Sequence, residues 1–112
     1  MNNKTEQDST FELWLEFELW TDGVKNPYDD FFNMTITLGN GSKYALNVWT
    51  YKYLTTAKAE ARHNGEHVGG IYMPAPDVFV EKLDRNLLEV MVNDMIENNQ
   101  LNEEWLVSEE QI

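Results

Sequence analysis

The chain has 112 residues and a mass of 13.1 kDa, the size of one domain built around a single hydrophobic core. Twenty acidic side chains against eight basic ones give a net charge of −12, which argues against direct binding to nucleic acid or to an anionic membrane. The sequence has no cysteine, no apolar run long enough to cross a membrane and no secretory signal, so we expect a cytoplasmic protein.

Three segments in the first half of the chain show the two-residue alternation of β-strands. Hydrophobic side chains alternate with glutamates and tryptophans over residues 11–20, and similar patterns follow over 31–38 and 43–50. A three-residue loop, Gly39-Asn40-Gly41, keeps the inward residues of the second and third strands on one face if Gly41 is left-handed. This loop predicts that Met34 lies opposite Leu46.

The second half of the chain adds two helices and short strands. Spacing of apolar residues predicts a helix over 53–63 and another over 85–98, the latter capped by Asp84. Residues 71–73 are expected to form a bent edge segment, and 78–80 a last short strand. The order β-β-β-α-β-α predicts an α+β, two-layer fold with a mainly antiparallel sheet and helices packed on one face.

We expect one domain over 1–112, with a flexible segment at 1–9 and a tail at 102–112 that docks on the body. The two ends carry the negative charge. Residues 1–22 contain six acids against one base, and residues 77–112 contain ten acids against two bases.

Motifs for catalysis or metal binding are weak. His63 and His67 are four residues apart, but Gly65 breaks the helix between them and no third ligand has a standard spacing. Asp29-Asp30 lacks the remaining positions of a calcium loop, and no serine stands in a nucleophile motif. We therefore expect no enzyme, no metal and no cofactor. A metal enzyme using His63 or His67 with carboxylates is the alternative.

The outward face of the predicted sheet is the main candidate binding surface. Tryptophans and glutamates on such a face supply the aromatic anchors and charges that dominate protein interfaces. In the alternative arrangement, residues 51–76 or the tail fold over these rings and bury them in a second small core. The candidate contact residues are Glu12, Trp14, Glu16, Glu18, Trp20 and Trp49.

A second acidic surface is predicted along the outward stripe of the last helix. Its candidate contacts are Glu89 and Glu97, with Asn86, Asn93 and Asp94 beside them. For this stripe taken alone, a solvated helix face is the preferred interpretation.

These features favour a protein-binding module with a basic protein partner. In its size, acidity and the turn-and-strand segment Gly41–Thr50, the chain resembles small bacterial immunity proteins, which neutralise toxins that are often basic nucleases. The resemblance implies that the protein occludes the toxin's active site, and it assigns no site residues. The alternatives are a nucleic-acid mimic that inhibits a DNA-processing enzyme, and a structural homodimer that buries the tryptophans against a second copy.

Overall fold

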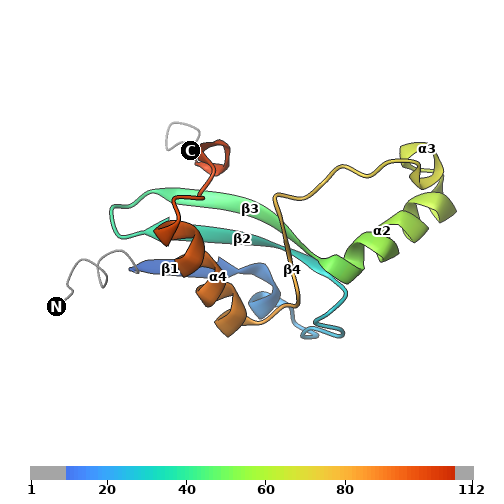
Figure 1. Ribbon diagram of the computed structural model, residues 1–112. Helices are drawn as coiled ribbons and strands as arrows, with labels where there is room; N and C mark the ends of the chain where they lie inside the picture. Colours follow the sequence, from blue (N-terminus) through green and yellow to red (C-terminus); the bar gives the residue numbers. More distant parts are fainter. Residues whose placement is uncertain (1–9, 108–112) are drawn as a thin grey trace.

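The computed structural model describes residues 10–107, and within this range the chain has an α+β fold, as predicted (Figure 1). The strands form one sheet in the order β1-β2-β3-β4. The first three strands are antiparallel, whereas β4 runs parallel to β3. Residues 1–9, expected to be flexible, and the end of the expected tail lie outside the described residues. The strands are β1 (Phe11–Leu15), β2 (Phe31–Leu38), β3 (Lys43–Thr50) and β4 (Val78–Val80).

The β2–β3 hairpin has the predicted register. Met34 lies opposite Leu46, and the turn is closed by the Leu38 amide, which donates to the Ser42 carbonyl oxygen at 2.8 Å. Gly41 has a φ of 92°, a conformation that glycine adopts without a steric penalty. The odd-length loop therefore keeps the apolar residues of both strands on the same face.

The prediction of one continuous strand over 11–20 is wrong beyond Leu15. Glu16–Leu19 form a 3-10 helix, η1, which leaves the sheet after the Leu15–Met34 pair. The Asn33 amide donates to the Glu16 carboxylate at 2.8 Å, so this side chain takes the place of the missing strand. Phe17 remains buried, because η1 still points it inward against Phe32, with ring centroids 4.9 Å apart.

Helix α4 (Arg85–Glu97) covers one face of the sheet (Figure 1). Its N-cap is Asp84, as predicted, and the Asp84 carboxylate accepts from the Leu87 amide at 3.2 Å. Leucine, valine and methionine side chains of the helix and sheet fill the space between them. The buried core includes Leu13, Leu15, Phe32, Met34, Ile36, Leu46, Val48, Leu88 and Val92.

Helix α2 (Tyr51–Asn64) does not lie on the sheet, contrary to the prediction that the helices pack on one face. It continues from the end of β3 and projects beyond the sheet together with the short α3 (His67–Gly70) (Figure 1). Residues 71–77 return to β4 without forming a strand. Within residues 10–107, the opposite face of the sheet therefore has no helix on it.

The segment after α4 lies along the first part of β3, which is not paired with β4. It contains a 3-10 turn, η2 (Glu103–Trp105), and Trp105 packs against the core. Leu106 forms an isolated antiparallel bridge with Tyr44. No helix in the described part of the chain is long and apolar enough to cross a membrane.

Candidate functional site: an open sheet face with an aromatic cluster

The sheet face opposite α4 is called the open face here. None of its side chains is buried, whereas most of the inward residues of the same strands are buried and the others are partly buried. Strand pairing brings these side chains into rows across the sheet. The open face consists of Glu12, Trp14, Phe31, Asn33, Thr35, Thr37, Lys43, Ala45, Asn47, Trp49 and Phe79.

Aromatic side chains occupy one end of the open face. Phe31, Trp49 and Phe79 lie side by side on β2, β3 and β4, because the register pairs Trp49 with each of the other two. Tyr53 contacts both Phe31 and Trp49, with ring centroids 4.9 Å and 5.0 Å apart. Tyr51 stacks on Phe79 at 5.7 Å. We refer to these five residues as the aromatic cluster.

The local sequence explains why the tyrosines join this cluster. Helix α2 begins directly after Thr50, so its first turn places Tyr51 and Tyr53 at the end of the sheet. Burial raises the pKa of Tyr53, and the nearby carboxylates of Glu60, Asp30 and Asp29 raise it further. The Tyr53 phenol is therefore neutral at physiological pH, which suits its position among apolar rings.

Polar groups lie between the aromatic cluster and Trp14. Asn33 and Asn47 are paired across β2 and β3, and both are exposed. The Asn47 amide donates to the Asp77 carboxylate at 2.7 Å, just as Asn33 donates to Glu16 on the other side of the sheet. A carboxylate therefore accepts a hydrogen bond from the backbone amide of each of these two asparagines.

The structure brings some of the predicted tryptophans and glutamates together and separates others. Glu12 and Trp14 lie on the open face and are exposed, with 46% of Trp14 accessible. Trp49 also lies there but is half-buried, because Tyr53 partly covers it as the alternative arrangement suggested. Trp20 does not lie on the outward sheet face where the alternation placed it, because it follows η1 and its ring packs against Phe17 on the core side.

Glu18 and Glu89 do not face a partner freely, because both carboxylates bind Arg85. The guanidinium contacts Glu18 at 2.7 Å and Glu89 at 2.9 Å, and it also donates to the Leu13 carbonyl oxygen at 3.0 Å. The hydrogen bond from Arg85 lowers the pKa of Glu18. Of the predicted acidic contacts on α4, Glu97 stays exposed, and it accepts a bond from the Asn93 side-chain amide at 3.2 Å.

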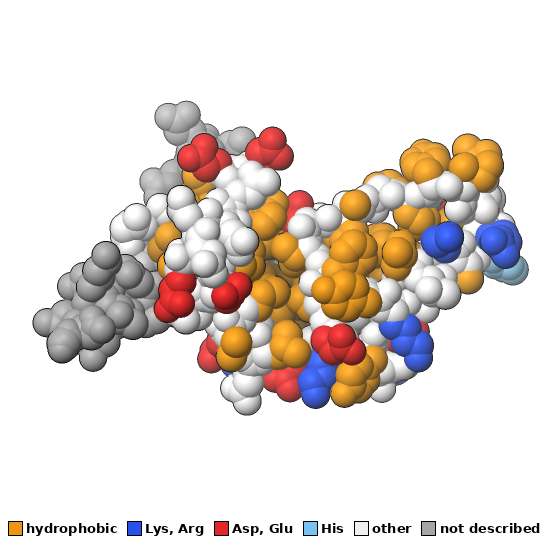
Figure 2. All heavy atoms as spheres, viewed as in Figure 1, with side chains coloured by type: hydrophobic (Ala, Val, Ile, Leu, Met, Phe, Trp, Pro, Cys, Tyr) orange, Lys and Arg blue, Asp and Glu red, His pale blue; other side chains and the backbone are white. Residues whose placement is uncertain are grey.

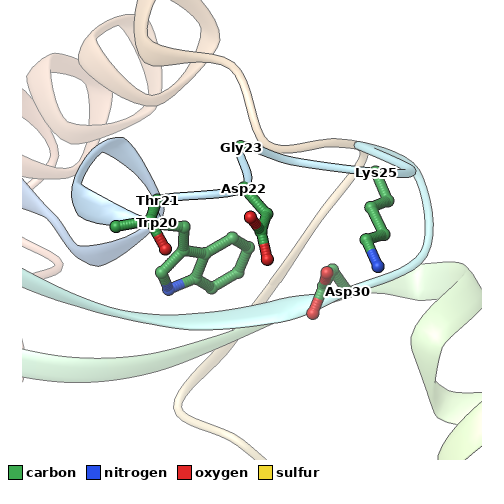
Figure 3. Close-up of a pocket in the computed structure, with 6 residues that line it drawn as sticks. All are labelled: Trp20, Thr21, Asp22, Gly23, Lys25 and Asp30. Carbon is green, nitrogen blue, oxygen red and sulfur yellow. The ribbon is translucent and has the colours of Figure 1, made fainter.

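A shallow hollow of about 370 Å³ lies beside the loop that follows η1. Figure 3 shows the Asp22 carboxylate next to the Trp20 ring, with Lys25 extending toward Asp30 across the hollow. Such an open, polar hollow lacks the enclosing apolar walls typical of a small-molecule site. Among the described residues, no group of three or more histidines, aspartates or glutamates could hold a metal ion, and this includes His63 and His67.

Of the aromatic cluster, the sequence predicted only Trp49 and missed Phe31, Phe79, Tyr51 and Tyr53. The alternation of β2 contained the signal for Phe31, because an inward Phe32 requires an outward neighbour. The same argument applies to Phe79 between Val78 and Val80. The position of Tyr51 in the cluster depends on the direction of α2, and no local sequence pattern predicts that direction.

Comparison of the chain with protein-family models, with curated proteins and with solved structures finds no significant match to any of them.

Proposed function

We infer that the protein is a binding module that engages a basic protein partner through the open face. The observation that supports this most directly is the exposure of large aromatic side chains on a sheet surface that carries no helix within residues 10–107. Trp14 is 46% exposed and Phe31 is 48% exposed. Exposed aromatics of this size, surrounded by polar groups, are typical of interface anchors.

The size of the open face fits a protein partner. The longest strands have eight residues, so the face is about 25 Å long, and four strands make it roughly 15 Å wide. Its area is therefore about half of the roughly 800 Å² that each partner contributes to a standard interface. A partner would also contact the surroundings of the face, where exposed carboxylates are frequent.

Charge favours a basic partner. The residues described outside 51–76 comprise fourteen acids against four bases, so the body that carries the open face is strongly negative. A field of this sign accelerates the encounter with a positive protein, while desolvated aromatic contacts slow its dissociation. Glu12 is the exposed carboxylate on the open face itself.

An immunity protein is the specific role that these properties suit best. In this role the open face covers the substrate cleft of a basic, nuclease-type bacterial toxin, and the protein supplies no catalytic group. The cleft of a nuclease is positive because it binds phosphates, so it matches an acidic inhibitor. Aromatic anchors would then provide specificity among related toxins.

The test is affinity capture from a lysate of the source organism at low and high salt, followed by assay of the retained protein. We expect one basic partner that is retained more strongly at low salt and whose nuclease activity is inhibited by the purified chain. The proposal is wrong if the retained proteins are acidic, or if a basic partner is bound but its activity is unaffected.

A further inference from the structure

Residues 51–76 form an arm with almost no core of its own. Ala57 and Ala61 are the buried hydrophobic side chains of this segment, and no arm residue belongs to the main core cluster. The tip of the arm, by contrast, displays large apolar groups. Val68 is 69% exposed, Ile71 is 78% exposed and Tyr72 is 56% exposed. Figure 2 shows hydrophobic side chains gathered over α3 at the end of the arm.

The backbone at the tip is held in an unfavourable conformation. His67, Val68, Gly69 and Gly70 all have positive φ, between 53° and 85°. A β-branched residue is rare there, because its side chain crowds the backbone. Gly70 also lies so close to α2 that an added Cβ would be 3.0 Å from the Lys58 carbonyl oxygen. Strain of this kind, combined with exposed apolar side chains, is typical of a binding element rather than of a connecting loop.

The arm has the opposite charge from the rest of the described chain. It contains three bases, Lys52, Lys58 and Arg62, against the two acids Glu60 and Glu66. Lys58 and Arg62 lie one helical turn apart and line the same shallow hollow on α2. The arm is therefore poorly suited to the basic partner of the open face, and it requires an acidic surface with apolar positions.

The other end of the same molecule offers such a surface. A hollow of about 210 Å³ lies between the end of α4 and η2, and its lining combines polar and apolar side chains, namely Leu38, Tyr44, Met95, Ile96, Asn99, Leu101 and Glu103. Glu97 and Glu104 are exposed nearby in the sequence. Figure 2 shows acidic side chains over α4 and η2 at one end of the molecule, and lysine and arginine side chains over α2 at the other.

We propose that the arm docks on the α4–η2 end of a second copy of this chain, with Ile71 or Tyr72 entering the hollow and Lys58 and Arg62 facing Glu97, Glu103 and Glu104. The two surfaces are different, so each arm contact is heterologous. Two copies that exchange arms form a two-fold dimer with two such contacts, whereas unreciprocated contacts give a ring or an open chain of copies. Neither of the two surfaces includes a residue of the open face, so this inference does not depend on the proposed function.

Sedimentation velocity of the purified full chain over a wide concentration range tests this contact. We expect species larger than the monomer that dissociate at high salt. Ile71→Asp, at an exposed position, should raise the dissociation constant about tenfold or more. Trp14→Ala and the loop variant Lys25→Glu are matched controls that should leave association unchanged.

Swapping the two charges of a proposed ion pair distinguishes a specific contact from nonspecific association. Arg62→Glu and Glu103→Arg should each weaken association, and their combination should restore most of it. A wild-type chain that is monomeric throughout would overturn the proposal, as would association that none of these variants changes. Cosedimentation of a monomeric chain with anionic vesicles would overturn it in favour of a lipid partner.

Discussion

Thr50 is the buried polar side chain at the junction of β3 and α2. It is fully inaccessible to solvent, and its hydroxyl accepts bonds from the Tyr53 amide at 3.1 Å and from the Asp30 amide at 3.2 Å. One side chain thereby caps the arm helix and fixes the loop before β2. The aromatic cluster depends on this junction, because Tyr51 and Tyr53 follow directly.

Replacing Thr50 with valine removes the acceptor while keeping the shape of the side chain. We expect Thr50→Val to lower the free energy of unfolding by about 2 kcal/mol, because two backbone donors lose their partner. Thr50→Ser keeps the acceptor and loses one methyl group, so it should cost less, about 1 kcal/mol. Urea denaturation of the three proteins measures the difference, and equal losses for the two variants would contradict this role.

Val68 provides a second test at a single residue. We expect Val68→Gly to stabilise the arm by about 1 kcal/mol, because glycine tolerates the φ of 55° and the valine side chain is mostly exposed. Val90→Gly is the matched control, since Val90 is 71% exposed on α4, where glycine should destabilise by roughly 0.5 kcal/mol. Hydrogen exchange of the α2 and α4 amides reports each effect. If Val68→Gly destabilises the arm, as Val90→Gly destabilises α4, the backbone at Val68 is unstrained.

Among the secondary-structure elements, Arg85 links β1, η1 and α4. Its guanidinium binds Glu18 on η1, Glu89 on α4 and the Leu13 carbonyl oxygen of β1. The carbonyl belongs to the edge strand of the sheet, so the arginine also protects an edge from pairing with another chain.

The pH dependence of stability tests the Glu18–Arg85 contact. Because the pKa of Glu18 is lowered in the folded state, its contribution is fully present above the ordinary value of 4.5 and is lost as the pH falls through the folded-state value. We expect Glu18→Gln to cost less than about 1 kcal/mol at neutral pH, since the side chain is 40% exposed. At strongly acidic pH the cost should disappear. A cost that is the same at both pH values would show that packing, not the ion pair, is responsible.

Periodicity predicted the regular elements well and the irregular ones poorly. The β2–β3 register and the Asp84 cap followed from local rules, because loop parity and side-chain acceptors act within a few residues. The end of β1 at Leu15 did not, since η1 keeps Phe17 inward and the alternation of residues looks unbroken. The Glu16 carboxylate accepts the hydrogen bond of the Asn33 amide that a continued β1 strand would have accepted. Such a contact becomes visible only in the tertiary fold.

The sequence placed the residues of the candidate site correctly where it predicted the strand correctly, and wrongly beyond the end of that strand. Glu12 and Trp14 lie on the open face because they belong to the part of the pattern that is a true strand. Glu18 and Trp20 were misplaced together, as a consequence of the single break at Leu15. The face opposite α4 stays open because α2 projects beyond the sheet. The direction of this projection depends on how the arm leaves β3 rather than on the composition of α2.

Charge and shape divide the described part of the molecule into two parts with different surface properties. The acidic body carries the open face with its aromatic groups. The arm carries basic side chains and an apolar tip (Figure 2). A protein arranged in this way can bind a basic partner on its body while the arm contacts an acidic surface.

The affinity of the captured basic partner for the purified wild-type chain, Trp14→Ala and Val90→Ala decides whether the open face is the binding surface. Trp14→Ala should weaken binding by about 2 kcal/mol, roughly thirtyfold, without loss of folding, because Trp14 is 46% exposed and outside the core. Val90→Ala, on the opposite side of the molecule, should bind like the wild type. An unchanged affinity for folded Trp14→Ala, or a loss confined to Val90→Ala, would contradict the account.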